Sequence, residues 1–312
     1  MSRGRTKLSV IGAGGVGVSV AYAALIRGSA AEVALYDIAT EKVDAEVLDL
    51  AHGTQFTSSS VSGGSDLSVV EGSDVVIVTA GAKQQPGQTR MELAGTNVRI
   101  LESLMPGLLE HAPDAVFIIV TNPADVMTVV AQRITGLPAN RVFGSGTVLD
   151  TSRLRWRLAQ RAGVSTASVH ADIVGEHGDS QFPVWSNATI GPVPILDWPG
   201  EQRFTPEELD RIAVEVRDAA YTVIRGKGAT NLAIGVSAAR IAEAVVRDEH
   251  AVLPVSTVLS GEHGIDGVAL SLPSVVSASG ALPVAGMPMT EAEEAKLQAS
   301  AAAIRASLDA LD

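Results

Sequence analysis

The sequence predicts an α/β protein whose first half forms a doubly wound parallel sheet and whose second half is α+β. Two patterns support this prediction. In the first half, short apolar runs alternate with longer stretches of helical periodicity, and a glycine-rich turn directly follows the first apolar run. Strands separated by helices need right-handed crossover connections, which make the strands parallel and place helices on both faces of the sheet.

The expected elements follow in order along the chain. Apolar runs predict strands at residues 8–11, 33–36, 75–79, 116–120 and 142–143, and helical patterns predict helices at 16–27, 41–50 and 93–110. After about residue 146 the pattern changes to a basic helix at 149–161, mixed strands that include 171–174, and two further helices. We therefore divide the chain into a first domain, residues 1–146, and a second domain, residues 147–312.

The two late helices carry clear start signals. The first opens with Thr205 as N-cap, Pro206 at the first helical position and Glu208 as the glutamate of a capping box. The second opens at Thr290 and has one apolar face, which should dock on the core: Leu297, Ala301, Ile304 and Leu308. The uncharged run at 267–290 is interrupted by prolines and glycines, so it predicts short strands with turns rather than a membrane span.

Composition excludes several classes of function. The formal net charge of −12 argues against a nucleic-acid partner, because nucleic acids attract basic surfaces. The chain has no cysteine, which excludes disulfides, thiolate catalysis and cysteine–metal sites, and no metal site is expected. The first residues contain no apolar block followed by a cleavage site, so we expect no signal peptide and a soluble, cytoplasmic protein without a membrane partner.

The glycine-rich turn has the pattern of a dinucleotide site. Residues 12–17 read GAGGVG, follow the first expected strand and open a helix. The first glycine permits the tight turn, the second lets the backbone approach a pyrophosphate, and the third lets the helix pack on the strand. Asp37 ends the second expected strand, where a carboxylate accepts the ribose hydroxyls and repels a 2′-phosphate. We therefore expect a Rossmann domain that binds NAD rather than NADP; the alternative is a structural turn with a solvated aspartate.

The chain also carries the residue types that hydride transfer to a 2-keto acid requires. His177, at the end of an expected strand, could exchange a proton near neutral pH, and Asp150 could orient its imidazole. Arg153 shares a helix face with Asp150 and offers a forked cation for a carboxylate, and Arg90 closes a loop with the composition of a mobile lid. Taken singly, each residue has a structural interpretation, such as a helix cap for Asp150 or a solvated helix charge for Arg153. Their occurrence together with the nucleotide motif favours catalysis.

At this point a family resemblance becomes specific. GAGGVG, TAGAKQQPGQTR, VTNPAD, SGTVLDTSR and GEHGDS occur in this order, and together they resemble the lactate/malate dehydrogenase family, its bacterial L-lactate dehydrogenases in particular. The resemblance implies that His177 is the proton donor and acceptor and that Asp150 steadies its imidazolium. It also implies that Arg153 binds the substrate carboxylate and that Arg90 polarises the carbonyl.

The resemblance further implies which residues surround the ligands. The expected substrate contacts are Gln84, Asn122, Asp125 and Thr230. The expected cofactor contacts are Gly12, Gly14, Val16, Gly17, Asp37, Lys42, Gly81, Ala82, Val120, Asn122, Ser145 and Ile234. Lys42 and Ser145 could instead be ordinary surface and turn residues.

Gln84 bears on the choice of substrate. Malate enzymes of the family carry arginine at the corresponding lid position, where it pairs the second carboxylate of oxaloacetate. A neutral glutamine leaves that carboxylate desolvated and unpaired, which favours pyruvate and L-lactate. A malate dehydrogenase and a branched 2-hydroxyacid dehydrogenase remain alternatives, and a non-catalytic NAD-sensing scaffold protein is a more remote one.

A second resemblance concerns regulation. Arg155 lies two residues after Arg153, so it should point away from the active site on a helix of 3.6 residues per turn. Bacterial L-lactate dehydrogenases activated by fructose 1,6-bisphosphate resemble this chain at Arg155 and at His170, where the two side chains meet across a subunit interface. This implies a homotetramer activated by the bisphosphate; a solvated arginine and an ordinary strand histidine are the alternative.

Overall fold

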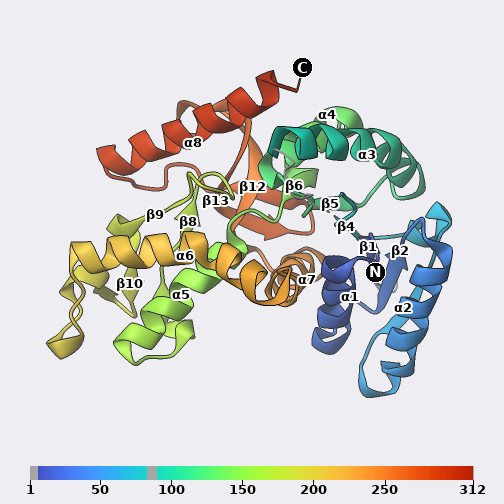
Figure 1. The fold of residues 1–312 in the computed structure, drawn as a ribbon, viewed down its shortest axis with the longest axis horizontal. Coiled ribbons are helices and arrows are strands. Elements are labelled where there is room, and N and C mark those ends of the chain that lie inside the picture. The colour runs from blue at the N-terminus through green and yellow to red at the C-terminus, as the bar shows by residue number, and fades with distance from the viewer. Residues whose placement is uncertain (1–5, 83–89, 312) are drawn as a thin grey trace.

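In the computed structural model, which describes residues 6–82 and 90–311, one nine-stranded sheet runs through the protein (Figure 1). Six of its strands are parallel, in the order β3-β2-β1-β4-β5-β6. Their bounds are Lys7–Ile11 (β1), Glu32–Tyr36 (β2), Ser60–Gly64 (β3), Val75–Val78 (β4), Val116–Ile119 (β5) and Val142–Gly144 (β6). The strand order reverses between β1 and β4, and in doubly wound sheets ligands bind at the carboxyl ends of the strands at such a point.

The expected parallel sheet is confirmed, with one strand that the sequence did not predict. β3 has the sequence SVSGG and lies at the edge of the sheet, next to β2. All five of its residues are partly exposed, so it contains no apolar run that could mark it as a strand.

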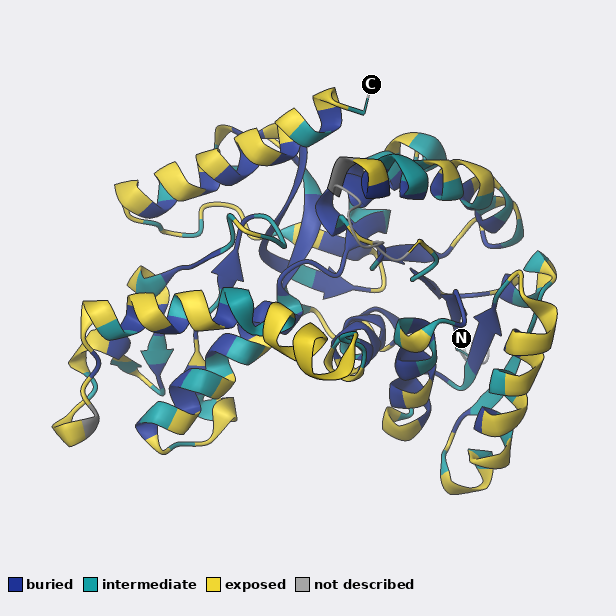
Figure 2. Cartoon of the chain, in the orientation of Figure 1, coloured by how far each residue is buried: buried dark blue, intermediate teal, exposed yellow. Residues whose placement is uncertain are grey.

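Helices cover both faces of the parallel strands. α1 (Gly15–Arg27), α2 (Thr40–His52) and α7 (Leu232–Val246) pack on one face, and α3 (Arg90–His111), α4 (Ala124–Thr135) and α8 (Glu291–Asp309) on the other (Figure 1). Successive side chains of the central strand β4 point to opposite faces of the sheet. Val75 and Ile77 belong to the apolar cluster under α1, α2 and α7, whereas Val76 and Val78 belong to the cluster under α3, α4 and α8. Figure 2 shows the central strands of the sheet buried and the outward faces of these helices exposed.

The sheet continues beyond β6 as an antiparallel hairpin. β12 (Ala251–Ser260) joins β6 through the pairing of Ser256 with Gly144, and β13 (Asp266–Ser277) and β14 (Gly280–Pro283) follow. The prediction of short strands over 267–290 is wrong for β13, which has 12 residues. Pro273 does not interrupt it: the carbonyls of Pro273 and its partner Pro254 accept from Val284 and Thr147, outside the hairpin. This is therefore a non-hydrogen-bonded pair, which needs no N–H from either proline.

The remainder of the second half surrounds α5 (Val148–Ala162) and α6 (Pro206–Lys227), which pack together over their own apolar cluster. Two small sheets join them: β7 (Val169–His170) with β10 (Thr189–Ile190) and β11 (Val193–Pro194), and β8 (Ile173–Val174) with β9 (Phe182–Pro183). Short 3-10 helices lie at Thr54–Phe56, Leu67–Val70, Ala139–Arg141, Thr166–Ser168, Trp185–Asn187, Ile195–Asp197, Gly200–Gln202 and Glu262–Gly264. Within 6–82 and 90–311, no helix is both long and apolar enough to cross a membrane.

The helix start signals are confirmed in part. The Thr205 side chain accepts from the Glu208 amide and Pro206 is the first residue of α6, as expected. In a capping box, the glutamate side chain would also accept from the backbone amide of the N-cap residue. The carboxylate of Glu208 instead pairs with Arg161 of α5 at 2.5 Å. A charged partner on a neighbouring helix outcompetes a backbone amide. α8 has the complete capping box, from Thr290 and Glu293, and its apolar face is buried as expected.

The close approach of α7 to α1 brings the two halves of the protein together. Gly235 in α7 lies so near α1 that a Cβ atom there would sit 2.6 Å from the backbone of Ser19. Asn231, just before α7, donates to the Ser19 hydroxyl at 3.1 Å, and that hydroxyl donates to the Gly15 carbonyl at 2.7 Å. The first turn of α7 is thereby held beside the glycine-rich turn.

Gly235→Ala should therefore destabilise the protein by about 1–3 kcal/mol, because the added methyl group forces α7 away from α1. Urea unfolding followed by circular dichroism measures this. Gly226→Ala in α6 is the matched control: nothing lies within 4 Å of a Cβ there, and alanine should stabilise that helix by up to about 1 kcal/mol. Equal stability of Gly235→Ala and the wild type would contradict the packing described.

Candidate active site

The glycine-rich turn after β1 forms an open cradle at the start of α1. Gly12 has a φ of 104°, which side chains rarely adopt, and a Cβ on Gly17 would lie 1.8 Å from the Gly12 carbonyl oxygen. Gly14 is the N-cap of α1, and the first turn of the helix contains no acidic residue. Nothing lies within 4 Å of a Cβ built on Gly14 or Gly15, so the helix N-terminus is accessible to an anion.

Asp37 lies beside this turn, as expected for a ribose ligand. One carboxylate oxygen accepts from the Ala13 amide at 2.7 Å and the other from the Ala39 amide at 3.0 Å. Each oxygen has a second lone pair for a hydroxyl group. Lys42 is exposed in the first turns of α2, where residues 39–42 line a surface hollow. The open cradle and the fixed carboxylate fit the pyrophosphate and ribose of a dinucleotide.

A buried asparagine joins the chain segments that follow β4 and β5. Asn97 of α3 accepts from the Ala82 amide at 2.8 Å and donates to the Asn122 carbonyl at 2.7 Å. The expected ligands Gly81 and Ala82 thus have a defined place beside Asn122. Sequence reasoning missed Asn97, because one asparagine in a helical pattern gives no sign of what it faces.

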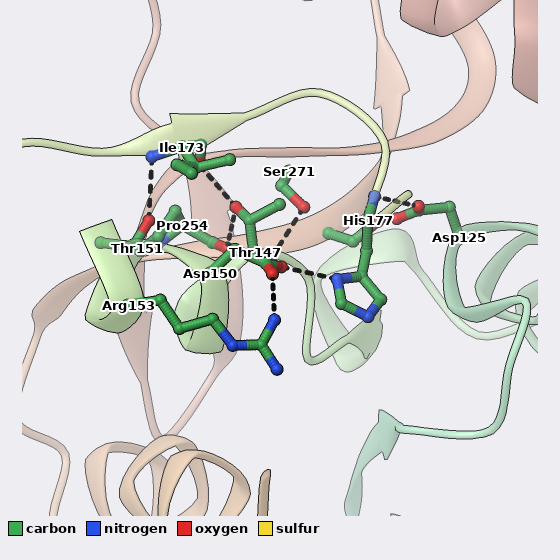
Figure 3. Close-up of polar contacts among 10 residues, drawn as sticks. Asp125, Thr147, Asp150, Thr151, Arg153, Ile173, His177, Pro254 and Ser271 are labelled. Carbon is green, nitrogen blue, oxygen red and sulfur yellow. Dashed lines mark hydrogen bonds and ion pairs between the residues drawn. The ribbon is translucent and has the colours of Figure 1, made fainter. Parts of the chain in front are cut away.

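His177, Asp150 and Arg153 come together as predicted (Figure 3). Nδ1 of His177 lies 2.6 Å from Oδ2 of Asp150, and Nη1 of Arg153 lies 2.7 Å from Oδ1 of the same carboxylate. Because an ionised carboxylate only accepts, Nδ1 carries a hydrogen, and Nε2 is the ring nitrogen that does not contact Asp150. Asp150 is buried, whereas the His177 side chain keeps 27% of its exposure. Its free edge is therefore accessible to a small molecule.

The electrostatics of this trio favour a protonated imidazole at neutral pH. Burial lowers the pKa of His177, but the charge and hydrogen bond of Asp150, with the charge of Asp125, outweigh it and raise the pKa to about 9. Burial likewise raises the pKa of Asp150, yet His177 and Arg153 hold it below its usual value. An imidazolium beside a fixed carboxylate and an arginine can give a proton to an anionic substrate.

Two threonines of the SGTVLDTSR segment hydrogen-bond to β8, the strand that precedes His177, and so hold it beside the start of α5. Thr147 donates through its hydroxyl to the Ile173 carbonyl at 2.5 Å, and Thr151 accepts from the Ile173 amide at 2.9 Å (Figure 3). Both polar groups of one β8 residue are therefore bound to the helix that carries Asp150. The spacing of the threonines, one helical turn apart, was the available signal, and sequence reasoning did not use it.

The His177 loop is also anchored from other directions. Gly175 pairs with Ser271 of β13, and Ser300 of α8 accepts from the Glu176 amide at 2.8 Å. The His177 amide donates to Oδ2 of Asp125 at 2.7 Å, and Ser256 of β12 donates to Oδ1 of Asp125 at 2.5 Å. Asp125 was expected to contact substrate, but in this structure each of its oxygens accepts a protein donor.

The other expected residues lie around the carboxyl ends of the parallel strands. Val120 and Asn122 follow β5, and Asn122 is exposed. Ser145 follows β6, is buried and donates its amide to the Ile119 carbonyl. Thr230 and Ile234 flank the start of α7, which packs on α1. Gln84 lies outside the described residues, and Arg90 is the first residue of α3, whose side chain is likewise not described.

Arg155 and His170 occupy a different surface from the His177 site. Arg155 donates to the Ala171 carbonyl at 2.9 Å and pairs with Asp172 at 2.7 Å, while Arg153 turns to Asp150. His170 is exposed in β7, adjacent in the chain to Ala171. Within the described ranges, no group of three histidine, aspartate or glutamate residues is placed to hold a metal ion.

Comparisons with known proteins agree over nearly the whole chain. The lactate/malate dehydrogenase NAD-binding domain model matches residues 6–144, and the family's alpha/beta C-terminal domain model matches residues 147–311. The chain is 48% identical to the L-lactate dehydrogenase of Bifidobacterium animalis subsp. lactis, covering 96% of this chain and 95% of that one. It is also 48% identical to that of a Synechococcus species, covering 98% and 99%. The crystal structure of a minor L-lactate dehydrogenase from Enterococcus mundtii superposes with a TM-score of 0.95 at 37% identity, covering 99% of each chain.

Proposed function

The chain belongs to the lactate/malate dehydrogenase family, and we propose that it is an NAD-dependent L-lactate dehydrogenase that interconverts pyruvate and L-lactate. The observation that carries the proposal is the buried Asp150 carboxylate, which binds both His177 and Arg153 at 2.6–2.7 Å. The residues around β1 and β2 fit NAD, and the nicotinamide supplies or accepts the hydride when the cofactor is bound.

The chain's own residues bind the substrate and move the proton. Arg153 uses one guanidinium nitrogen for Asp150, and Figure 3 shows the other turned away from that carboxylate. We propose that this second nitrogen binds the substrate carboxylate. In pyruvate reduction, Nε2 of His177 gives its proton to the carbonyl oxygen, while Asp150 keeps Nδ1 in place. By family resemblance, Arg90 polarises that carbonyl, and Asn122 and Thr230 contact the substrate.

Substrate preference is proposed to depend on Gln84. A second carboxylate, as in oxaloacetate, would find a neutral amide there and lose its hydration without a cation. Pyruvate has only a methyl group at this end. An NADH-oxidation assay with pyruvate, oxaloacetate and longer 2-keto acids tests the proposal against malate and branched 2-hydroxyacid dehydrogenase activity.

We also propose that fructose 1,6-bisphosphate activates a homotetramer through Arg155 and His170. The proposal is supported by the bond from Arg155 to the Ala171 carbonyl, which ties the arginine to the strand end that carries His170. Two cations suit a phosphate group with close to two negative charges. The phosphate would have to displace Asp172 from Arg155, so an unliganded protein keeps the arginine neutralised.

The pH dependence of the two directions should be opposite. Pyruvate reduction needs protonated His177, whose pKa is raised to about 9. Its kcat/KM should therefore stay level below about pH 9 and fall by about tenfold per pH unit above it. Lactate oxidation needs the neutral imidazole, so its kcat/KM should rise by about tenfold per pH unit and level off above about pH 9.

His177→Asn is the control for this profile. It should lower turnover by about 10²–10⁴-fold and abolish both pH limbs, because no proton is left to exchange. NADH affinity, measured by fluorescence, should change little, since Gly14 and Asp37 lie elsewhere. Near-normal turnover in this variant would refute the assignment of His177.

Gln84→Arg should change the substrate preference. A cation at this position pairs the second carboxylate of oxaloacetate, so the ratio of kcat/KM for oxaloacetate to that for pyruvate should rise by about 10²-fold or more. Gln85→Arg adds the same charge one residue further along and should leave the ratio near the wild-type value. An unchanged ratio in Gln84→Arg would mean that residue 84 does not meet the substrate.

Fructose 1,6-bisphosphate should lower the pyruvate concentration at half saturation by about 5–150-fold and raise the sedimentation coefficient. Arg155→Gln should lose both responses. Arg157→Gln should keep them, because Arg157 pairs with Glu215 of α6 instead. The proposal fails if the wild type shows neither response at both mildly acidic and neutral pH.

A further inference from the structure

The carboxylate of Asp125 connects the two parts of the active site. Asp125 is the second residue of α4, in the part of the chain that carries the cofactor motif, and only 2% of it is exposed. Its Oδ2 accepts the His177 amide at 2.7 Å, and its Oδ1 accepts the Ser256 hydroxyl at 2.5 Å. Both donors belong to the other half of the chain. Figure 3 shows this carboxylate meeting the backbone of His177 on the side of the ring away from Asp150.

We propose that Asp125 is a positioning residue for the reaction: it fixes the backbone of His177 and places a second negative charge behind the imidazolium. The proposal rests on the proposed function, because it gives Asp125 a role through the proton donor. It takes the place of the expected substrate contact of Asp125, since only 2% of this residue is exposed and both of its carboxylate oxygens are hydrogen-bonded to protein donors.

Three described residues carry the charges that act most on His177. Asp150 and Asp125 favour the imidazolium, and Arg153 opposes it. Asp125 in turn faces His177, which favours its ionised form, and Glu176, which opposes it. Burial raises the pKa of Asp125 to about 6, although the bonds from Ser256 and His177 lower it. Between about pH 6 and about pH 9 both Asp125 and His177 are therefore charged, and below about pH 6 His177 loses one of its two anions.

The geometry lets Asp125 change its protonation without releasing the loop. A protonated carboxyl group keeps one oxygen as acceptor for the His177 amide and donates its hydrogen to the Ser256 hydroxyl, which can also accept. Asparagine can reproduce the same arrangement: its amide oxygen accepts from His177 and its NH₂ group donates to Ser256. Asp125→Asn thus removes the charge while both hydrogen bonds are retained, which separates electrostatics from support of the backbone.

Histidine NMR of the ligand-free protein tests the charge. The chain has 6 histidines, and the resonance missing from His177→Asn identifies the relevant imidazole. Asp125→Asn should lower the titration midpoint of His177 by about one pH unit, and Asp150→Asn should lower it by more. Ser256→Ala is the matched control: it removes a hydrogen bond to Asp125 but leaves the carboxylate charge, so the midpoint should stay near the wild-type value.

The wild-type titration gives an answer even if a variant does not fold. The His177 resonance should show a second, smaller inflection near pH 6, where Asp125 gains a proton, and this inflection should be absent from Asp125→Asn. A single inflection in the wild type would overturn the proposal. So would an equal midpoint in Asp125→Asn and the wild type, or an equal decrease in Asp125→Asn and Ser256→Ala, which would indicate loop packing alone.

Kinetics then connect Asp125 to the reaction. In Asp125→Asn, the decrease of kcat/KM for pyruvate at alkaline pH should begin at a lower pH, and this shift should equal the shift of the NMR titration midpoint. At pH 6.5, where His177 is protonated in both proteins, the KM for pyruvate should be unchanged. An increase of KM by about tenfold or more at that pH would indicate that Asp125 contacts the substrate directly, and it would overturn the positioning role. Failure of the wild type to reduce pyruvate would refute the proposed function, while the NMR titration would still decide the role of Asp125.

Discussion

The pairing of His177 with the buried carboxylate of Asp150 determines what the rest of the chain has to provide. A carboxylate removed from water is stable only if its oxygens are bound by strong donors, and here an imidazole and a guanidinium provide them. The two partners come from different elements, α5 and the loop after β8. Their separation must therefore be fixed by contacts that do not take part in chemistry. Thr147 and Thr151, at the start of α5, fix β8, and Asp125 and Ser300 fix the loop.

The cofactor half and the substrate half are parts of one sheet. β6 and β12 pair directly, and the apolar clusters on both faces of the sheet contain residues from either half of the chain. The division at residue 146 describes the change in pattern along the sequence and not a physical gap. Because of this continuity, the sheet positions the glycine-rich turn, the start of α7 and the His177 loop relative to one another. A hydride donor and a proton donor can act on the same carbon–oxygen bond only under that condition.

The sequence was informative wherever a local pattern has one physical meaning. Alternating apolar runs and helical periodicity identified five parallel strands, and the glycine spacing identified the nucleotide turn. Asp150, His177 and Arg153 were predicted together because their chemistry is complementary, and the structure brings them into contact. The polar strand β3 was missed because an edge strand needs no apolar run. The length of β13 was underestimated because Pro273 was taken as an interruption, whereas its pairing with Pro254 costs the hairpin no hydrogen bond. Asn97, Ser256 and Ser300 could not be found this way, because their partners are distant in sequence. Asp125 was expected to contact the substrate because it belongs to the VTNPAD motif, but the sequence does not tell which way its side chain points.

The junction of β6 with β12 has a consequence for how the protein is made. Gly144 and Ser256, which pair across it, are about 110 residues apart in the chain. During synthesis the six parallel strands can assemble before β12 leaves the ribosome, and β6 then presents an open, apolar edge. Val142 and Phe143 of that edge are completely buried in the finished protein. The interval between translation of the first and second halves is therefore the period in which a nascent chain is most exposed to edge-to-edge association. Chaperone contact or rapid elongation would matter most over residues 145 to 260.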